Sequence, residues 1–255
     1  MVAHERSVRD GGDFVIRMED LDRVASAGTW AMRQLVDLAA VGVKSDFPVV
    51  YQSQRFEIYR AYVRDLERRG LTYPCYCSRK EISESASAPH GEIQIYGGRC
   101  RYLSDGQRNE LARSRPPAIR LNVDPVVRSE GFVNDIVLVR NDGVPAYNLA
   151  VVVDDELQGI TEVVRGCDLF SVTPSQKYLQ ALLGFRTLSY LHVPLVVGPD
   201  GERLAKRHGD VSLADCLKLG FSAQAVRRAL LNSIQAGSDG WGESSSLSEW
   251  LKSLL

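Results

Sequence analysis

Apolar residues recur along this chain with two different spacings. In segments 29–41 and 55–69 they stand three to four positions apart, which is the spacing of an amphipathic helix, and a glycine follows each segment. Shorter runs rich in valine, isoleucine and leucine predict strands at 13–19, 118–123 and 132–140. Because strands alternate with helices, the pattern favours an α/β fold with a mainly parallel sheet.

The segment that begins at Tyr147 supports two interpretations. Its valine run at 151–153 favours a strand, whereas the spacing of its leucines and valines also suits a helix. The pattern leaves both open.

The start of a helix is clearer after this segment. The sequence TPSQ predicts a helix with Thr173 as N-cap, Pro174 in the first turn and Gln176 at the capping-box position, and Gly184 follows its end. A short strand is expected at 192–198. Two further helices, each with a serine cap, are expected at 212–219 and 222–234, and another at 247–255.

The composition changes between Leu71 and Asn122, where cysteines cluster and a tract of small residues occurs. This change predicts a subdomain inserted between two halves of a larger fold. The sequence therefore divides into a first half of the larger fold (1–70), an insertion (71–122), a second half (123–210) and C-terminal helices (211–255).

The overall composition is that of an ordinary globular protein, with 44% hydrophobic residues, 25% charged residues and a net charge of −1. Its apolar runs are far too short to cross a bilayer, and its polar N-terminus does not resemble a signal peptide. We therefore expect a cytoplasmic protein with no membrane partner. A net charge near zero neither favours nor excludes binding to nucleic acid.

Three cysteines, Cys75, Cys77 and Cys100, lie within 26 residues. Thiolates are strong zinc ligands, and a tetrahedral structural site needs a fourth donor. Both His90 and Tyr96 are candidates, and residue type favours His90 because imidazole is a common zinc ligand. The alternative interpretation is three buried free thiols.

Charged residues also end two apolar segments. Glu19 follows the strand at 13–19, where a carboxylate could bind an ammonium group, although an acidic surface turn has the same pattern. Arg165 ends an apolar run, where its guanidinium could clamp a carboxylate with two hydrogen bonds or form a structural salt bridge. The loop GERLAKRHG at 201–209 is either a solvated turn or an arm that reaches a phosphate.

Together these segments resemble one family. IRMEDLD, YNLAVVVDDELQGITEVVRGCDL, HVPLVVGPDGERLAKRHG and the CxC…YxxxC cluster are similar to the catalytic core of glutamyl-tRNA synthetases, from about residue 13 to residue 234. They are most similar to a short branch of that family that attaches glutamate to the queuosine base in the anticodon of tRNA(Asp). The resemblance implies a class I synthetase Rossmann-like α/β domain, incomplete at its N-terminus, with an inserted zinc-binding subdomain and a short helical C-terminal region.

The resemblance also implies roles for individual residues. Lys206 matches the catalytic lysine of the KMSKS-type loop, which approaches the phosphates of ATP, although Ala205 replaces the usual serine. The implied substrates are L-glutamate, ATP with Mg²⁺, and tRNA(Asp) carrying queuosine. The implied glutamate-binding residues are Glu19, Tyr147 and Arg165, and the implied Zn²⁺ ligands are Cys75, Cys77, Tyr96 and Cys100, which favours Tyr96 over His90.

The chain departs from the family pattern at its start. Family members carry a PSPTG-like segment and a His-Ile-Gly-His-type motif upstream of the segment matched by IRMED, and neither occurs in these 255 residues. Only 49 residues follow Lys206, too few for a large helical anticodon-reading region. Two interpretations follow: a glutamyl transferase whose sequence lacks its natural start, or an inactive remnant or fragment of an ordinary glutamyl-tRNA synthetase.

Overall fold

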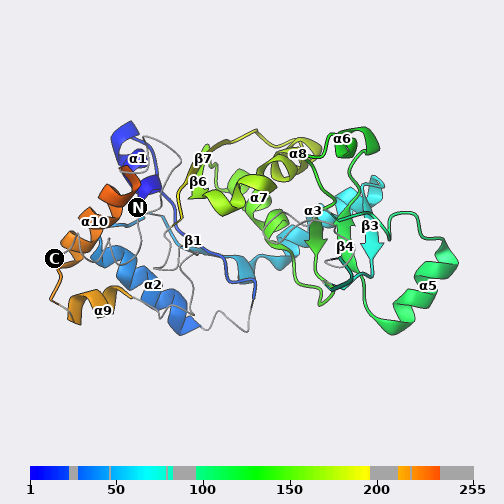
Figure 1. Ribbon diagram of the computed structural model, residues 1–255, viewed down its shortest axis with the longest axis horizontal. Coiled ribbons are helices and arrows are strands. Elements are labelled where there is room, and N and C mark those ends of the chain that lie inside the picture. The colour runs from blue at the N-terminus through cyan, green and yellow to red at the C-terminus, as the bar shows by residue number, and fades with distance from the viewer. Residues whose placement is uncertain are drawn as a thin grey trace.

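The computed structural model describes residues 1–22, 28–45, 47–78, 80–82, 96–195, 212–218 and 220–235 (Figure 1). Strands in these ranges form three small sheets. β1 (Arg17–Met18) pairs in parallel with β2 (Val50–Tyr51), and β6 (Glu162–Gly166) pairs in parallel with β7 (Ser189–Val193). β3 (Thr72–Cys75), β4 (Ala118–Leu121) and β5 (Val137–Val139) form an antiparallel sheet.

The expectation of one mainly parallel sheet is therefore only partly correct for the described residues. The strand predicted at 13–19 is reduced to the two residues of β1. The antiparallel sheet also joins β5, from the predicted second half, to β3 and β4 of the predicted insertion. Alternation of strands and helices along the sequence does not reveal this pairing, because strand partners are chosen by tertiary packing.

Two predicted amphipathic helices are present. α2 spans Gly28–Ala40 and α3 spans Phe56–Arg68. α3 follows a short 3-10 helix, η1 (Gln52–Gln54), and buries one stripe formed by Tyr59, Val63 and Leu66. Its charged residues lie on the opposite side, as expected for a helix that covers a core.

The ambiguous segment forms a helix, α7 (Tyr147–Leu157), followed by β6. Residues 149–155 of α7 are all buried. A helix that is enclosed on every side has no polar face, so its apolar residues do not show a helical period. This is why the sequence pattern did not distinguish it from a strand.

α8 spans Thr173–Leu183, but the predicted capping box is absent. A 3-10 helix, η2 (Cys167–Val172), leads directly into it, and its N-cap is Val172 with φ −88° and ψ −10°. Capping by a side chain needs an extended N-cap residue, which this continuous backbone does not provide. Gly184 ends the helix as predicted, with a left-handed φ of 72°.

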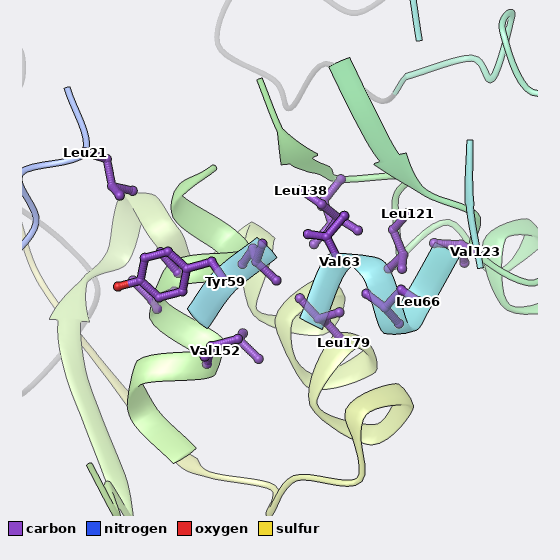
Figure 2. Packing of buried hydrophobic residues seen from close by; sticks show 14 residues of the cluster. Leu21, Tyr59, Val63, Leu66, Leu121, Val123, Leu138, Val152 and Leu179 are labelled. Atoms are coloured by element: carbon purple, nitrogen blue, oxygen red, sulfur yellow. The ribbon is translucent and has the colours of Figure 1, made fainter. Parts of the chain in front are cut away.

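α7 supplies residues 149–153 to the main hydrophobic core, where Val152 lies near Tyr59 of α3 (Figure 2). Leu66 of α3, Leu138 of β5 and Leu179 of α8 are fully buried in this cluster. The core thus joins elements from both sides of the predicted insertion.

Further helices in the described ranges are α1 (Val2–Asp10), α5 (Asp105–Ser114), α6 (Pro125–Ser129), α9 (Leu213–Lys218) and α10 (Ala223–Gln235). The helix predicted at 247–255 lies outside these ranges. The predicted serine caps of α9 and α10 are present: the Oγ of Ser212 accepts from the Asp215 N–H at 3.3 Å, and the Oγ of Ser222 accepts from the Ala225 N–H at 3.1 Å. Among the helices in the described ranges, none is both long and apolar enough to span a membrane.

Candidate functional site

The three clustered cysteines come together in the structure. The Sγ atoms of Cys75, Cys77 and Cys100 all lie within 4.8 Å of one another, and those of Cys77 and Cys100 are 3.5 Å apart. Cys75 ends β3 and Cys77 follows two residues later, so the CxC spacing turns both thiols toward the segment that carries Cys100.

The hydroxyl of Tyr96 supplies a fourth polar atom to this cluster. It lies 3.4 Å from the Sγ of Cys75 and 3.6 Å from that of Cys77, and it accepts the Cys100 N–H at 2.9 Å. In a tetrahedral zinc site the donor atoms would be about 3.5–3.8 Å apart, given Zn–S bonds of about 2.3 Å and Zn–O bonds of about 2.0 Å. The distances that Tyr96 makes therefore fit a shared ion. His90 lies outside the described residues.

Burial controls the ionisation of these donors. It raises the pKa of Cys77 to about 12 and that of Tyr96 well above its ordinary value. Burial also acts to raise the pKa of Cys100, but hydrogen bonds from the Tyr96 hydroxyl and the Tyr76 N–H reverse this and lower it. A divalent cation would favour the deprotonated forms of all four groups, so the donor set is suited to a soft metal ion.

Asp135 holds this cluster against the antiparallel sheet, a role that the sequence did not suggest. Its buried carboxylate accepts from the Tyr73 hydroxyl at 2.8 Å and from Arg101 Nη1 at 3.0 Å. Arg128 lies 3.7 Å from the same carboxylate and donates to the backbone oxygen of Tyr96 at 2.7 Å. No sequence spacing relates these residues, because they come from separate segments.

A second group of candidate residues lies where β1, α7 and β6 approach one another. Glu19 directly follows β1, Tyr147 opens α7 and Arg165 lies in β6. The pKa of Tyr147 is raised to about 12, chiefly by burial and also by the charge of Glu19, while the charge and a hydrogen bond of Arg165 act to lower it. Burial likewise raises the pKa of Glu19, while Arg17 and Arg165 act to lower it. The structure thus brings these three residues together.

The guanidinium of Arg165 is held by several neutral groups. Its Nη1 donates to Gln176 Oε1 at 2.7 Å, and its Nη2 donates to Thr173 Oγ1 at 2.7 Å and to the Leu169 carbonyl at 3.2 Å. Its Nε lies 3.4 Å from Nε2 of His192, whose pKa is lowered by burial. Among the described residues, no carboxylate forms an ion pair with Arg165, which removes the salt-bridge interpretation for that part of the chain.

This geometry also changes how Arg165 could bind a carboxylate. A guanidinium has five N–H groups, and both of those on Nη2 are already used. The two-pronged clamp expected from the sequence is therefore not presented. On Nη1 one N–H donates to Gln176 and one remains. Tyr147 interacts with the same guanidinium, so a carboxylate would meet one donor from each residue.

Two adjacent acids of α7 form a buried network next to this group. Asp154 accepts from Gln52 Nε2 at 3.0 Å, Arg55 Nε at 2.7 Å and the Tyr59 hydroxyl at 2.7 Å. Asp155 pairs with Arg17 Nη1 at 2.9 Å. The sequence did not suggest a role for these acids, although two aspartates directly after a valine run are a signal of paired buried charge.

Lys206 and the rest of the basic loop at 201–209 lie outside the described residues. Its approach to ATP therefore stays a prediction from the sequence.

Comparisons with known proteins identify the relatives of this chain. Residues 6–235 match the family model for tRNA synthetases class I (E and Q), catalytic domain. A glutamyl-Q tRNA(Asp) synthetase of Nocardia farcinica is 50% identical over 234 residues, which are 88% of this chain and 75% of that protein. One from Cutibacterium acnes is 46% identical over 236 residues, 88% of this chain and 67% of that protein.

Longer relatives match over part of their length. A glutamate–tRNA ligase of a Synechococcus species is 38% identical over 239 residues, 87% of this chain and half of that ligase. The structure of a glutamate–tRNA synthetase from Elizabethkingia anophelis superposes with a TM-score of 0.69 at 21% identity, and the match covers 98% of this chain and 60% of that one. This structural similarity shows that the two chains share a fold.

Proposed function

Since the chain belongs to the family of tRNA synthetases class I (E and Q), which are ligases, we propose that it activates L-glutamate with ATP and transfers the glutamyl group to tRNA. We further propose that the acceptor is the queuosine base in the anticodon of tRNA(Asp). The names of the relatives that are 46–50% identical support this choice.

The choice of glutamate as the amino-acid substrate rests on the charge of Arg165. Its side chain is part-buried, and its partners in the described structure are uncharged. Two other part-buried arginines have acidic partners: Arg17 pairs with Asp155, and Arg55 with Asp154. Glu19 and Asp155 interact with Arg165 through their charges, but neither forms an ion pair with it in the described structure. A part-buried guanidinium without a paired carboxylate is costly, so this position favours a ligand that brings its own carboxylate.

In the proposed complex, Arg165 and Tyr147 bind the side-chain carboxylate of glutamate, and Glu19 binds its α-ammonium group. The α-carboxylate oxygen attacks the α-phosphorus of ATP; the bond to the β-phosphate breaks and pyrophosphate leaves. Lys206 stabilises the charge that develops on the phosphates, where Mg²⁺ would also act. An amine or hydroxyl of the tRNA then attacks the carbonyl of glutamyl-adenylate, and AMP leaves. The protein contributes by positioning and electrostatics.

We also propose that Cys75, Cys77, Cys100 and Tyr96 hold a structural Zn²⁺. The proposal rests on the four donor atoms: the Tyr96 hydroxyl lies 3.4 and 3.6 Å from the Sγ atoms of Cys75 and Cys77, those of Cys77 and Cys100 are 3.5 Å apart, and the three Sγ atoms lie within 4.8 Å of one another. The three shorter separations are close to those of tetrahedral ligation. All four positions would be filled by the protein, which leaves no open position for a substrate. The ion would stabilise the fold around β3 and α5.

Pyrophosphate exchange tests the first step. The full chain, and a form extended by any coding sequence upstream, should exchange labelled pyrophosphate into ATP only when glutamate is present. Lys206→Ala should slow exchange about a hundredfold, which is the scale of losing one contact to transition-state charge. No glutamate-dependent exchange by either form would contradict the proposal and support an inactive remnant.

The acceptor is tested with tRNA(Asp) purified with and without queuosine. Labelled glutamate should transfer to the modified tRNA alone. Transfer to the 3′ end of unmodified tRNA(Glu) would instead identify the activity of an ordinary glutamate–tRNA ligase, the name carried by the longer relatives.

A further inference from the structure

Gln176 is an almost completely buried side chain that contacts Arg165 directly. Only 1% of it is exposed, and it lies in the first turn of α8. Its Oε1 accepts from Arg165 Nη1 at 2.7 Å, and its Nε2 donates to Asn148 Oδ1 at 2.8 Å. The amide therefore bridges β6 to the start of α7, where Asn148 follows Tyr147.

This bridge uses both ends of the amide. The acceptor end faces a guanidinium, which has only N–H groups to offer, and the donor end faces the Oδ1 of Asn148. A methionine of similar size would leave both contacts unmade. A glutamate would keep the contact to Arg165 but would have no N–H for Asn148.

The charge of this side chain matters as much as its hydrogen bonds. Gln176 orients the guanidinium without neutralising it, as do Thr173 and the Leu169 carbonyl. A carboxylate at 2.7 Å would give Arg165 a permanent counter-ion in a part-buried setting. The guanidinium would then gain little from a second carboxylate supplied by a ligand.

We propose that Gln176 is a positioning residue that sets amino-acid specificity: as a neutral acceptor it fixes Arg165 and leaves its charge available, so that a side-chain carboxylate binds in preference to a side-chain amide. This inference rests on the proposed function, because it takes glutamate as the ligand of Arg165. It adds the residue that keeps the site selective for glutamate over glutamine.

The test compares Gln176→Glu with the unchanged chain. Binding of L-glutamate and of L-glutamine is measured by calorimetry and by the shift in Tm that each amino acid produces. In Gln176→Glu the ratio of glutamate to glutamine affinity should fall roughly tenfold to a hundredfold, which is the range for losing one hydrogen bond to a charged group. The Tm without ligand reports separately on stability. If Gln176 had a structural role alone, the substitution would change this Tm and leave the ratio of glutamate to glutamine affinity constant.

Two further variants separate charge from shape. Gln176→Met removes both hydrogen bonds without adding charge, so it should weaken glutamate binding while glutamate stays preferred. Gln180→Glu makes the same substitution one turn later, at a side chain that is equally buried but donates to the Tyr190 hydroxyl. It should lower the Tm and change the glutamate-to-glutamine ratio much less than Gln176→Glu does.

The outcomes distinguish this inference from the function on which it rests. If the unchanged chain binds neither amino acid, the proposed function fails and the inference fails with it. If the unchanged chain prefers glutamate and Gln176→Glu keeps the full preference, the proposed function stands and the inference is overturned. A loss of preference in Gln180→Glu equal to that in Gln176→Glu would also overturn it.

Discussion

The guanidinium carbon of Arg120 lies over the ring of Tyr96, 4.0 Å from its centroid. The hydroxyl of the same ring reaches the thiols of Cys75 and Cys77, while Arg120 Nη1 donates to the backbone oxygen of Asp135 at 2.6 Å. The cysteine cluster and the antiparallel sheet are thus joined through one aromatic ring. Changes on either side of this contact should affect both.

The cysteine cluster should bind one zinc ion per chain. Cys75→Ser and Cys100→Ser should release the metal and lower the Tm, since structural zinc contributes directly to folding. The measurement is metal analysis of protein prepared with added zinc. Cys216→Ser, which changes a buried cysteine outside the cluster, should retain the ion. Far less than half an equivalent in the unchanged chain would refute the site.

Tyr96 should contribute to zinc affinity. Tyr96→Phe keeps the ring beneath Arg120 but removes the oxygen that faces Cys75 and Cys77, so the affinity measured by competition with a chelator should fall. His90→Ala is the comparison. Unchanged affinity in Tyr96→Phe together with loss in His90→Ala would show that the histidine is the fourth ligand.

Asp135 should be important for stability. Asp135→Ala removes the common partner of Tyr73 and Arg101 and leaves buried donors unpaired, so unfolding in urea should require about 3–5 kcal/mol less free energy. Asp65→Ala is a matched control: in the described structure Asp65 pairs with Arg68 and Arg69 at the surface, so this substitution should cost less than about 1 kcal/mol. Similar losses for the two variants would rule out a central role for Asp135.

The core around α7 should be sensitive to loss of volume. Leu179 is fully buried in α8, so Leu179→Ala should lower the free energy of unfolding by about 2–5 kcal/mol. Leu157, at the end of α7, is 50% exposed, and Leu157→Ala should change it by less than about 1 kcal/mol. Urea denaturation of both variants measures the difference, and equal effects would mean that α8 does not pack as described.

Glu81 should make stability depend on pH in acid. Hydrogen bonds from the Ser78 backbone and side chain, together with Arg115, lower its pKa to about 2 from an ordinary 4.5. A carboxyl with a lowered pKa in the folded state stabilises above its unfolded pKa, and the effect is lost as the pH falls toward 2. The difference in Tm between the unchanged chain and Glu81→Gln should therefore be largest above pH 5 and should shrink below 4.5. A difference that stays constant over this range would contradict the assignment.

Tyr147 should contribute to glutamate use if it shares the ligand carboxylate with Arg165. Tyr147→Phe removes one neutral donor, and the KM for glutamate in pyrophosphate exchange should rise roughly tenfold, the scale of about one hydrogen bond. The KM for ATP should change little. Tyr62→Phe, in the core near Phe185, is the control and should leave both constants unchanged. A larger effect on ATP than on glutamate would place Tyr147 elsewhere in the reaction.

Much of the local structure could be predicted from the sequence. The helical spacing at 29–41 and 55–69 and the serines before α9 and α10 act between neighbours in the chain, so they specify α2, α3 and the two caps without long-range information. The CxC spacing also indicated that Cys75 and Cys77 would lie together. These are short-range effects, and they hold in any fold that buries the same faces.

Tertiary structure decided the rest. The sequence left α7 ambiguous because burial on all sides removes the polar face that marks a helix. It placed Gln176 in a cap, whereas in the folded chain this side chain accepts a hydrogen bond from Arg165 of β6. It suggested a carboxylate clamp at Arg165 without showing that neutral groups occupy most of its donors. Partners such as Asp135 and Arg101 are 34 residues apart, and only the folded chain brings them within hydrogen-bonding distance.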